Sequence, residues 1–309
     1  MVAPEEPIDA GVGLDATLPA VGPTRTPLYR AMNADRYERQ RQIRELQVMT
    51  ERTLLCYVAG PSASLERDDV LPLVDVFHTV ALGSHIDLLL HTGGGDIDAA
   101  EKMASMLRNH VGDAGEFRIV VPDFAKSAGT LLTFAADTVV MSDSSELGPV
   151  DPQLNLPDGS GGHNWRPAQS YVDAYEELVK LVNDDPAAAG YRQMLDKYDP
   201  TTVDMCRKVL KRSTKLAETL LEKGMLRGGK GNFTALARDL SDNRKWLWHG
   251  RPVDYLEAKK LGLDVTYLEL TDNVWQRYWA LYCAQRLALN SHPPNCKLFE
   301  SDYVSIPVT

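Results

Sequence analysis

The chain has 309 residues, of which 44% are hydrophobic and 25% charged, a composition typical of a folded globular protein rather than a disordered one. Asp and Glu outnumber Lys and Arg by 43 to 33, and the net charge of −10 gives no overall attraction to nucleic acid or to an anionic membrane. The four cysteines are far apart and form no CxxC pair, which indicates reduced thiols. No apolar stretch approaches the roughly 18 residues of a membrane span. We therefore expect a cytoplasmic protein without a membrane span or a nucleic-acid partner.

The N-terminal segment differs in character from the rest. Residues 1–27 mix Pro, Gly, Ala and acidic residues without periodicity, which predicts a flexible tail, and they lack the basic and apolar regions of a secretory signal. Residues 28–52 are rich in good helix formers, with Ile43 and Leu46 on one side and charges elsewhere. This pattern predicts a mostly solvated helix.

From residue 53 onward, short apolar runs alternate with amphipathic segments. The pattern predicts strands at 53–60, 86–92, 117–122 and 138–142, with helices at 68–83, 98–111 and 127–136 between them. Continuous apolar strands separated by helices are typical of a parallel sheet that is covered on both faces. We therefore expect an α/β core.

The second half of the chain is mostly helical. Helices are predicted at 168–183, 201–223, 252–262 and 273–289, with a last strand at 263–270. This reading gives one domain over residues 53–270, followed by a C-terminal helix and tail over 271–309.

Two strand ends carry residues suited to chemistry. The first is HTGGGDIDAAEKMA, residues 91–104, where three glycines lie between a buried strand and a helix. Glycines there allow a close backbone approach and leave amide groups free for an anion or an oxyanion, although a tight turn would use them equally well. The run is neither a GxGxxG motif nor a Walker loop.

The second is FAKSAGTLLTFAAD, residues 124–137, where Ser127 precedes a very apolar helix of small residues. A serine in this position is more often a helix cap than a nucleophile. However, the carboxyl ends of parallel strands lie along one edge of a sheet, so Ser127 and the glycine loop can converge on one carbonyl group, as acyl transfer requires. Lys126 is expected to point away from the serine if the segment is extended.

These motifs carry a family resemblance. GGGD before a helix, followed about 30 residues later by KSAGTLLTFAADTVVMSDSSELGPVDPQ, resembles the Clp-peptidase/crotonase superfamily and most closely the serine dehydrogenase proteinase family. That family is related to Clp-type peptidases and to signal peptide peptidase A, and the similarity runs from about residue 28 to 270. The resemblance implies a Clp/crotonase-like spiral core of ββα units around a parallel sheet, with a helical C-terminal half.

The resemblance also implies roles for particular residues. Ser127 matches the nucleophile, and the amides of Gly94 or Gly95 and of Ala128 match the oxyanion hole. The Clp-type histidine is absent, because the stretch after the nucleophile helix reads ELGPVDPQ. The serine dehydrogenase proteinase family is described with a triad in the order Ser, Asp, His, and Asp151 and His249 fit that order.

Other assignments stay open at this stage. Lys180 would be the base of a Ser/Lys dyad, as in signal peptide peptidases, and His163 is a rival base in a glycine-rich loop. Asp151 could be a turn former before a proline, and His249 could be packed among the neighbouring tryptophans. The remaining histidines lack the spacing of a zinc site, so no metal and no cofactor are predicted.

The leading hypothesis is a cytoplasmic serine peptidase that cleaves peptides or proteins through an acyl-enzyme on Ser127. The resemblance further implies a homo-oligomer. Two alternatives are a scaffold of the same fold that has lost activity and, less favoured, a crotonase-like enzyme acting on acyl-coenzyme A.

Overall fold

The structure is a computed structural model that describes residues 26–157 and 162–309. The chain divides into two units, Met1–Ala34 and Asp35–Thr309. The described part of the first unit contains α1 (Pro27–Met32). Thr26 caps the N-terminus of this helix, because its side chain accepts a hydrogen bond from the Tyr29 amide. The predicted tail therefore lies almost entirely outside the described residues.

A seven-stranded sheet forms the centre of the second unit. Its strand order is β11-β10-β1-β2-β3-β5-β9, in which β1, β2, β3, β5 and β9 run parallel, whereas β10 pairs antiparallel with β1 and with the edge strand β11. The strands are β1 (Thr53–Ala59), β2 (Ile86–His91), β3 (Phe117–Val120), β5 (Thr138–Met141), β9 (Val265–Tyr267), β10 (Lys297–Glu300) and β11 (Ser305–Val308).

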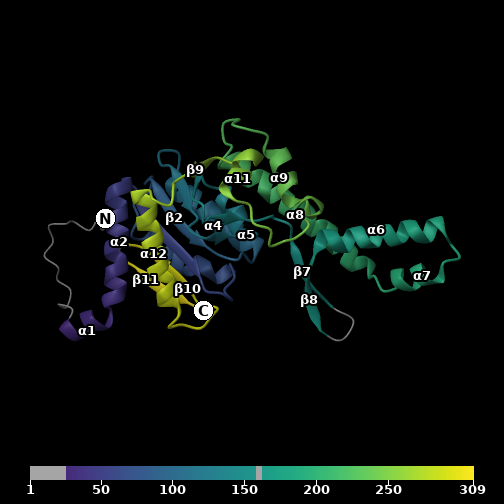
Figure 1. Ribbon diagram of the computed structural model, residues 1–309, viewed down its shortest axis with the longest axis horizontal. Helices are drawn as coiled ribbons and strands as arrows, with labels where there is room; N and C mark the ends of the chain where they lie inside the picture. The colour runs from purple at the N-terminus through teal and green to yellow at the C-terminus, as the bar shows by residue number, and fades with distance from the viewer. Residues whose placement is uncertain (1–25, 158–161) are drawn as a thin grey trace, which may run out of the picture. The chain divides into compact units, whose positions relative to one another are not determined.

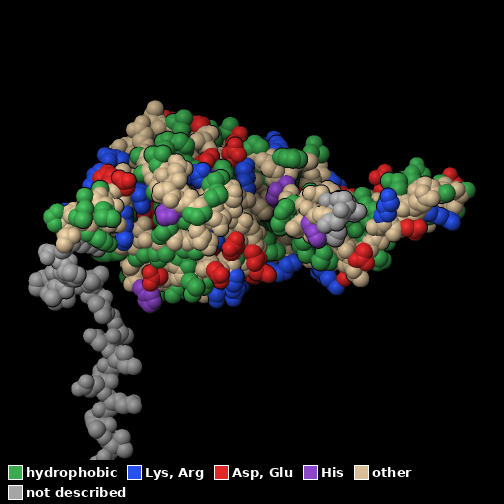
Figure 2. Space-filling model, turned by 90° about the horizontal axis from the view of Figure 1, so that it is seen from below, with side chains coloured by type: hydrophobic (Ala, Val, Ile, Leu, Met, Phe, Trp, Pro, Cys, Tyr) green, Lys and Arg blue, Asp and Glu red, His purple; other side chains and the backbone are tan. Residues whose placement is uncertain are grey.

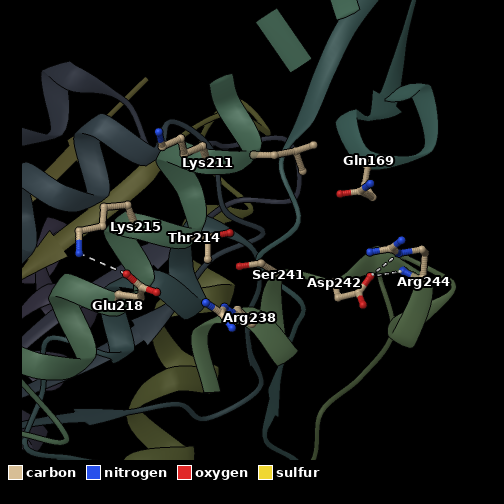
Figure 3. A pocket seen from close by; sticks show the side chains of 10 residues that line it. Gln169, Lys211, Thr214, Lys215, Glu218, Arg238, Ser241, Asp242 and Arg244 are labelled. Atoms are coloured by element: carbon tan, nitrogen blue, oxygen red, sulfur yellow. Dashed lines mark hydrogen bonds and ion pairs between the residues drawn. The ribbon is translucent and has the colours of Figure 1, made fainter. Parts of the chain in front are cut away.

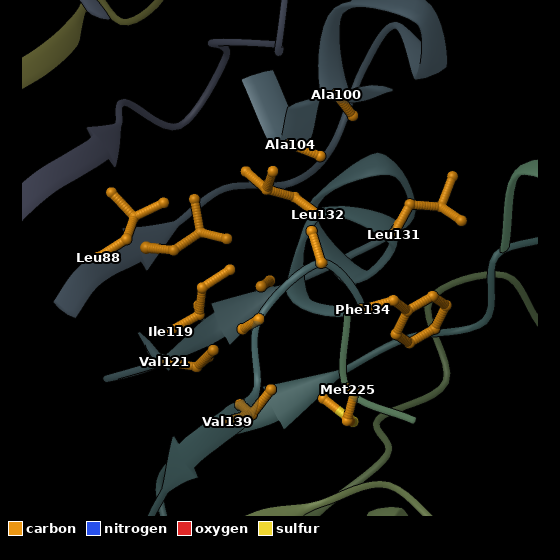
Figure 4. Packing of buried hydrophobic residues seen from close by; sticks show 14 of the residues in the cluster. Leu88, Ala100, Ala104, Ile119, Val121, Leu131, Leu132, Phe134, Val139 and Met225 are labelled. Atoms are coloured by element: carbon orange, nitrogen blue, oxygen red, sulfur yellow. The ribbon is translucent and has the colours of Figure 1, made fainter. Parts of the chain in front are cut away.

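Alternate residues of each strand enter two different hydrophobic clusters, because successive side chains point to opposite faces of a sheet. On one face, Leu88 and Ile119 pack with residues of α3 (Val70–Phe77), α4 (Ile97–Val111), α5 (Ala128–Thr133) and α8 (Pro200–Lys223). On the other face, Leu89 and Val120 pack with α2 (Ala34–Thr50) and α12 (Asn273–Leu289). Figure 4 shows the first of these clusters, with α5 lying over the strands. Burial of both faces explains why the strands read as continuous apolar runs.

The remaining elements lie outside the seven-stranded sheet and the helices named above. They are the short helix η1 (Arg67–Asp69), β4 (Phe124–Ala125), β6 (Glu146–Leu147), β7 (Gln153–Pro157), β8 (His163–Pro167), α6 (Ala168–Asp184), α7 (Ala189–Leu195), α9 (Phe233–Ser241), α10 (Asn243–Trp246) and α11 (Tyr255–Leu261). In Figure 1 the hairpin β7–β8 and the pair α6–α7 project beyond the sheet. A third small cluster around Val172 and Cys206 packs α6 against α8 at the base of this projection.

The predicted strands and main helices of the α/β core are present, but three features differ from expectation. Helix α2 buries Ile43 and Leu46 on one side as its pattern indicates, but it also buries Arg39, which makes a two-pronged ion pair with the buried Glu300. The C-terminal tail contains β10 and β11, which extend the sheet beyond β1. His163, expected in a glycine-rich loop, begins β8, which pairs antiparallel with β7, while residues 158–161 lie outside the described part. The first two differences arise from contacts between segments far apart in sequence, Arg39 with Glu300 and β1 with β10.

The surface has no dominant sign of charge on the face seen in Figure 2, where acidic and basic side chains of the described residues are interspersed. Such a face produces no extended field that would attract a polyanion. Among the described residues, no helix is long and apolar enough to cross a membrane.

Candidate active site

The turn that carries Ser127 is strained. Ser127 has φ 51° and ψ −118°, one of three positive-φ non-glycine residues in the described chain. A non-glycine residue in such a conformation costs about 1–3 kcal/mol, and such strain concentrates at functional sites. Ser127 occupies the N-cap position of α5, yet its side chain makes no capping hydrogen bond. The hydroxyl is therefore not used as a helix cap.

Lys126, next to the serine, is engaged elsewhere. Its Nζ donates to Glu146 Oε2 at 2.8 Å and to the Leu147 carbonyl at 2.9 Å. The expectation that Lys126 points away from the serine assumed an extended segment, whereas β4 ends at Ala125 and Ser127 has φ 51°. The Lys126 ammonium is instead bound to residues of β6.

The glycine loop lies directly against the serine turn. A Cβ atom placed on Gly94 would come within 2.7 Å of the Lys126 carbonyl oxygen and 2.8 Å of Ser127 Cβ. Gly94 has φ +102° and Gly95 φ +147°, conformations that side-chain-bearing residues rarely adopt. The loop is held on its other side by Leu65, whose amide donates to Gly94 O and whose carbonyl accepts from Asp96 N. The absence of side chains at these two glycines is what permits the contact.

The three amides named for the oxyanion hole differ in availability. The Gly94 amide already donates to Thr92 Oγ1 at 3.1 Å. The amides of Gly95 and Ala128 have no acceptor among the residues that the structure describes. Because the Ala128 amide opens α5 and Gly94 brings the loop against it, Gly95 and Ala128 are the available pair of donors.

Thr92 is a positioning residue that sequence reasoning missed. Besides accepting the Gly94 amide, its own amide donates to Phe124 O and its carbonyl accepts from Lys126 N. It therefore joins the glycine loop to the serine segment. A threonine after a buried strand gives no sequence signal for this role, since both partners are found only in the folded chain.

Asp151 and His249 meet in the structure although 98 positions separate them in sequence. His249 Nδ1 lies 2.7 Å from Asp151 Oδ1; the aspartate side chain is 1% exposed and that of the histidine 23% exposed. Asp151 Oδ2 is buried and has no hydrogen-bond partner among the described residues. A buried carboxylate in this contact fixes the imidazole with Nδ1 protonated and Nε2 free to accept a proton.

Paired segments connect the serine turn with the segments that carry Asp151 and His249. Ala125 pairs with Thr92 on one side and with Leu147 on the other, and Leu147 exchanges hydrogen bonds of 2.9 and 3.0 Å with Val253. Ser127 follows Ala125 by two residues, Asp151 follows Leu147 by four and His249 precedes Val253 by four. Four residues of extended chain span at most about 13 Å. Ser127, Asp151 and His249 therefore each lie within a short length of chain from one set of adjacent paired segments.

The alternative bases lie on the projecting elements. Lys180 is exposed on α6. The first residue of this helix, Ala168, donates its amide hydrogen to the carbonyl of Pro152, which is next to Asp151. Lys180 is twelve residues, or about 18 Å along the helix, beyond Ala168. His163 is exposed at the far end of β8, four residues or about 13 Å from the Gln153–Pro167 pair. Neither is brought to the serine turn by a hydrogen bond or a strand pairing among the described residues. The described residues also contain no group of three or more side chains suited to hold a metal ion.

A buried histidine lies one residue before Thr92. His91 is 2% exposed, its Nδ1 lies 3.2 Å from the Tyr282 hydroxyl, and that hydroxyl donates to Asp123 Oδ2 at 2.8 Å. Burial, with a smaller contribution from the nearby Arg286 charge, lowers the pKa of His91 to about 3. The imidazole is thus neutral and supports the start of the glycine loop.

This pKa predicts a pH-dependent loss of stability. Between pH 6.5 and about 3 the unfolded chain binds a proton at His91 that the folded chain does not, so the free energy of unfolding falls as the pH is lowered through this range. The contribution is at most about 1.4 kcal/mol per pH unit. We expect the variant His91→Gln to show a correspondingly shallower decline than the wild type in urea unfolding curves measured from pH 7 to 4. Parallel curves for the two proteins would contradict the assignment.

A family model described as ClpP-like SDH-type serine proteinase matches residues 68–294. The uncharacterized protein MJ0137 of Methanocaldococcus jannaschii is 34% identical over 183 residues, which are 58% of this chain and 53% of that protein, so the chain spans about half its length. The uncharacterized protein MJ1495 of the same organism is 25% identical over 74% of this chain and 68% of its own.

Solved structures of the 1510-N membrane-bound stomatin-specific protease are also similar. The match to one mutant of that protease covers 67% of this chain and 75% of the mutant's chain, with 14% sequence identity and a TM-score of 0.40. Another mutant, in complex with a substrate peptide, covers 67% and 71% with 13% identity and a TM-score of 0.39.

Proposed function

This chain belongs to the family of ClpP-like SDH-type serine proteinases, and from that premise we propose that it cleaves peptide bonds with Ser127 as nucleophile, His249 as general base and Asp151 as the residue that orients the histidine. The observation that carries the proposal is the 2.7 Å contact between the buried Asp151 carboxylate and His249 Nδ1. Paired strand segments connect this pair with the strained turn of Ser127. Such a pair has the tautomer that a serine hydroxyl requires.

The proposed reaction follows acyl transfer. Ser127 Oγ attacks the scissile carbonyl carbon while His249 Nε2 accepts the hydroxyl proton, and the negative charge that develops on the carbonyl oxygen is bound by the amides of Gly95 and Ala128. When the tetrahedral intermediate collapses, the imidazolium gives its proton to the leaving amine and an ester forms on Ser127. Water, activated by the same histidine, then attacks the ester carbonyl, releases the acid product and restores the serine.

The geometry of the serine turn favours an active peptidase over a scaffold of the same fold that has lost its activity. A serine kept at positive φ with no capping bond, beside unused amides, is a costly arrangement that a purely structural turn does not need. A crotonase-like reaction would use the amides alone and would give no role to the Asp151–His249 pair.

We further propose that the protein acts in the cytoplasm as a homo-oligomer. All four cysteines are free, as expected for a reducing compartment. The projecting α7 exposes Tyr191 and Met194, apolar side chains of the kind found between subunits. Light scattering of the purified protein tests the assembly, and a monomer at micromolar concentration would end that part of the proposal.

The experiment that tests the peptidase is covalent labelling. We expect a fluorophosphonate probe to add to Ser127 in the full-length protein, located by peptide mass spectrometry, because only an activated serine reacts with it. The Ser127→Ala protein should not be labelled, whereas Ser62→Ala, which changes an exposed serine outside the strained turn, should be labelled as the wild type is. Labelling elsewhere, or none in the folded protein, would refute the proposal.

A further inference from the structure

The structure contains a hollow that is separate from the proposed active site, because no residue named for the triad or the oxyanion hole lines it. It has a volume of about 570 Å³, within the range of small-molecule sites, and lies among α6, α8, α9 and α10. Helix α8 contributes Lys211, Thr214, Lys215 and Glu218, which recur at the three- and four-residue spacing that places side chains on one face of a helix. We refer to this hollow as the α8–α9 pocket.

The α8–α9 pocket has an excess of positive charge. Four basic and two acidic side chains line it. Lys215 is paired with Glu218 at 3.2 Å and Arg244 with Asp242 at 3.0 Å, as the dashed lines in Figure 3 mark. Lys211 and Arg238 have no ion-pair partner within residues 26–157 and 162–309. Two uncompensated cations are therefore among the residues that line the pocket.

A buried hydroxyl supplies an independent indication of a ligand. Ser241 is 7% exposed and its Oγ has no hydrogen-bond partner among the described residues, although it lines the pocket. Figure 3 shows Ser241, Thr214 and Arg238 gathered at one side of the pocket. A buried hydroxyl without a partner costs free energy unless something accepts its hydrogen bond, and an anion beside two cations is such an acceptor.

The walls of the pocket are held rigidly. The Leu240 carbonyl, next to Ser241, accepts the Val150 amide at 3.0 Å, and Ser213 Oγ, between the pocket residues of α8, donates to the Val150 carbonyl at 3.0 Å. Both helices are thus fixed to the segment that leads to Asp151. Side chains on regular elements fixed in this way are preorganised for a ligand.

We propose that the α8–α9 pocket binds a phosphate group, with Lys211 and Arg238 as its cationic partners and the Ser241 hydroxyl as a hydrogen-bond donor. A phosphate monoester carries a charge of about −1.5 to −2 at neutral pH, which matches the two uncompensated cations, whereas one carboxylate would neutralise only one of them. Guanidinium and ammonium groups are the side chains that bind phosphate most strongly. The phosphate can be free or part of a small metabolite, since the pocket is larger than the ion alone.

Isothermal titration calorimetry of the full-length protein at constant ionic strength tests the proposal. We expect saturable 1:1 binding of inorganic phosphate or of glycerol 3-phosphate, with sodium acetate binding at least about tenfold more weakly. Tighter binding of glycerol 3-phosphate than of phosphate would identify an ester as the ligand class, and the reverse order would identify the free ion. Absence of saturable binding by both, or equal binding of acetate, would overturn the proposal.

Variants assign the binding to this pocket. Lys211→Ala and Arg238→Ala should each weaken binding about tenfold to a hundredfold, the usual effect of losing a charged hydrogen bond. Lys223→Ala, an exposed lysine near the end of the same helix and outside the pocket, should leave it unchanged. Ser127→Ala should bind as the wild type does, so the result does not depend on the proposed peptidase. Equal affinity in the Lys211 and Arg238 variants, with unchanged thermal melting, would place the binding elsewhere and refute the inference.

Discussion

Replacing His249 with alanine is expected to lower the peptidase rate constant by about 10⁴-fold or more, because the Ser127 hydroxyl then has no base to accept its proton. Asp151→Asn should give a loss of about the same size, since an amide at this position stabilises the wrong tautomer of the imidazole. Both losses should be in kcat, measured with a fluorogenic peptide that the wild type cleaves, because neither residue is assigned to ground-state binding.

Matched variants separate this triad from its alternatives. Lys180→Ala and His163→Ala remove the two other candidate bases, which lie exposed on the projecting elements, and should leave the rate within about twofold of the wild type. A large loss in Lys180→Ala together with an active His249→Ala would replace the triad by a Ser/Lys dyad. Thermal melting of each variant shows whether a loss of rate reflects unfolding.

Replacing Gly95 with alanine is expected to cost both stability and activity. A Cβ atom there would lie 2.4 Å from the Leu65 carbonyl oxygen and 2.5 Å from its amide nitrogen, and the backbone has φ +147°. Neither backbone atom can move without breaking the hydrogen bonds that hold the loop, so we expect a loss of about 2–4 kcal/mol in the free energy of unfolding. Activity should fall further than stability alone explains, because the Gly95 amide is a proposed oxyanion donor.

The neighbouring Gly93 provides the control. No atom lies within 4 Å of a Cβ placed on it, and its φ is not positive. Gly93→Ala should therefore change the free energy of unfolding by less than about 1 kcal/mol and leave the rate nearly intact. If chemical denaturation gave the two alanine variants the same stability, the close approach of the loop to Leu65 would be wrong.

The central α/β core is readable from the sequence. Each parallel strand is buried on both faces, so its apolar run is continuous and stands out from the amphipathic helices on either side. The family model confirms the expected family, and the fold class is confirmed by the mostly parallel sheet with helices on both faces. The resemblance rests on the block around Ser127, which is local in sequence.

Other elements could not be predicted because their stability is not local. Strands β10 and β11 form by antiparallel pairing, β10 with β1 and β11 with β10, and β1 lies more than 230 positions away in sequence. The burial of Arg39 in α2 likewise depends on its ion pair with Glu300, more than 260 positions away. A helix with charged residues on several sides looks solvated until its partner is known.

For the site, the sequence by itself determined the chemical residues and the glycines that a close backbone approach requires. Only the tertiary structure decided how these groups are used. It turned Lys126 toward Glu146, assigned the Gly94 amide to Thr92, and joined Asp151 to His249 across 98 positions. The physical reason is that hydrogen bonds and ion pairs depend on distance in space, and strand pairing sets that distance independently of separation along the chain.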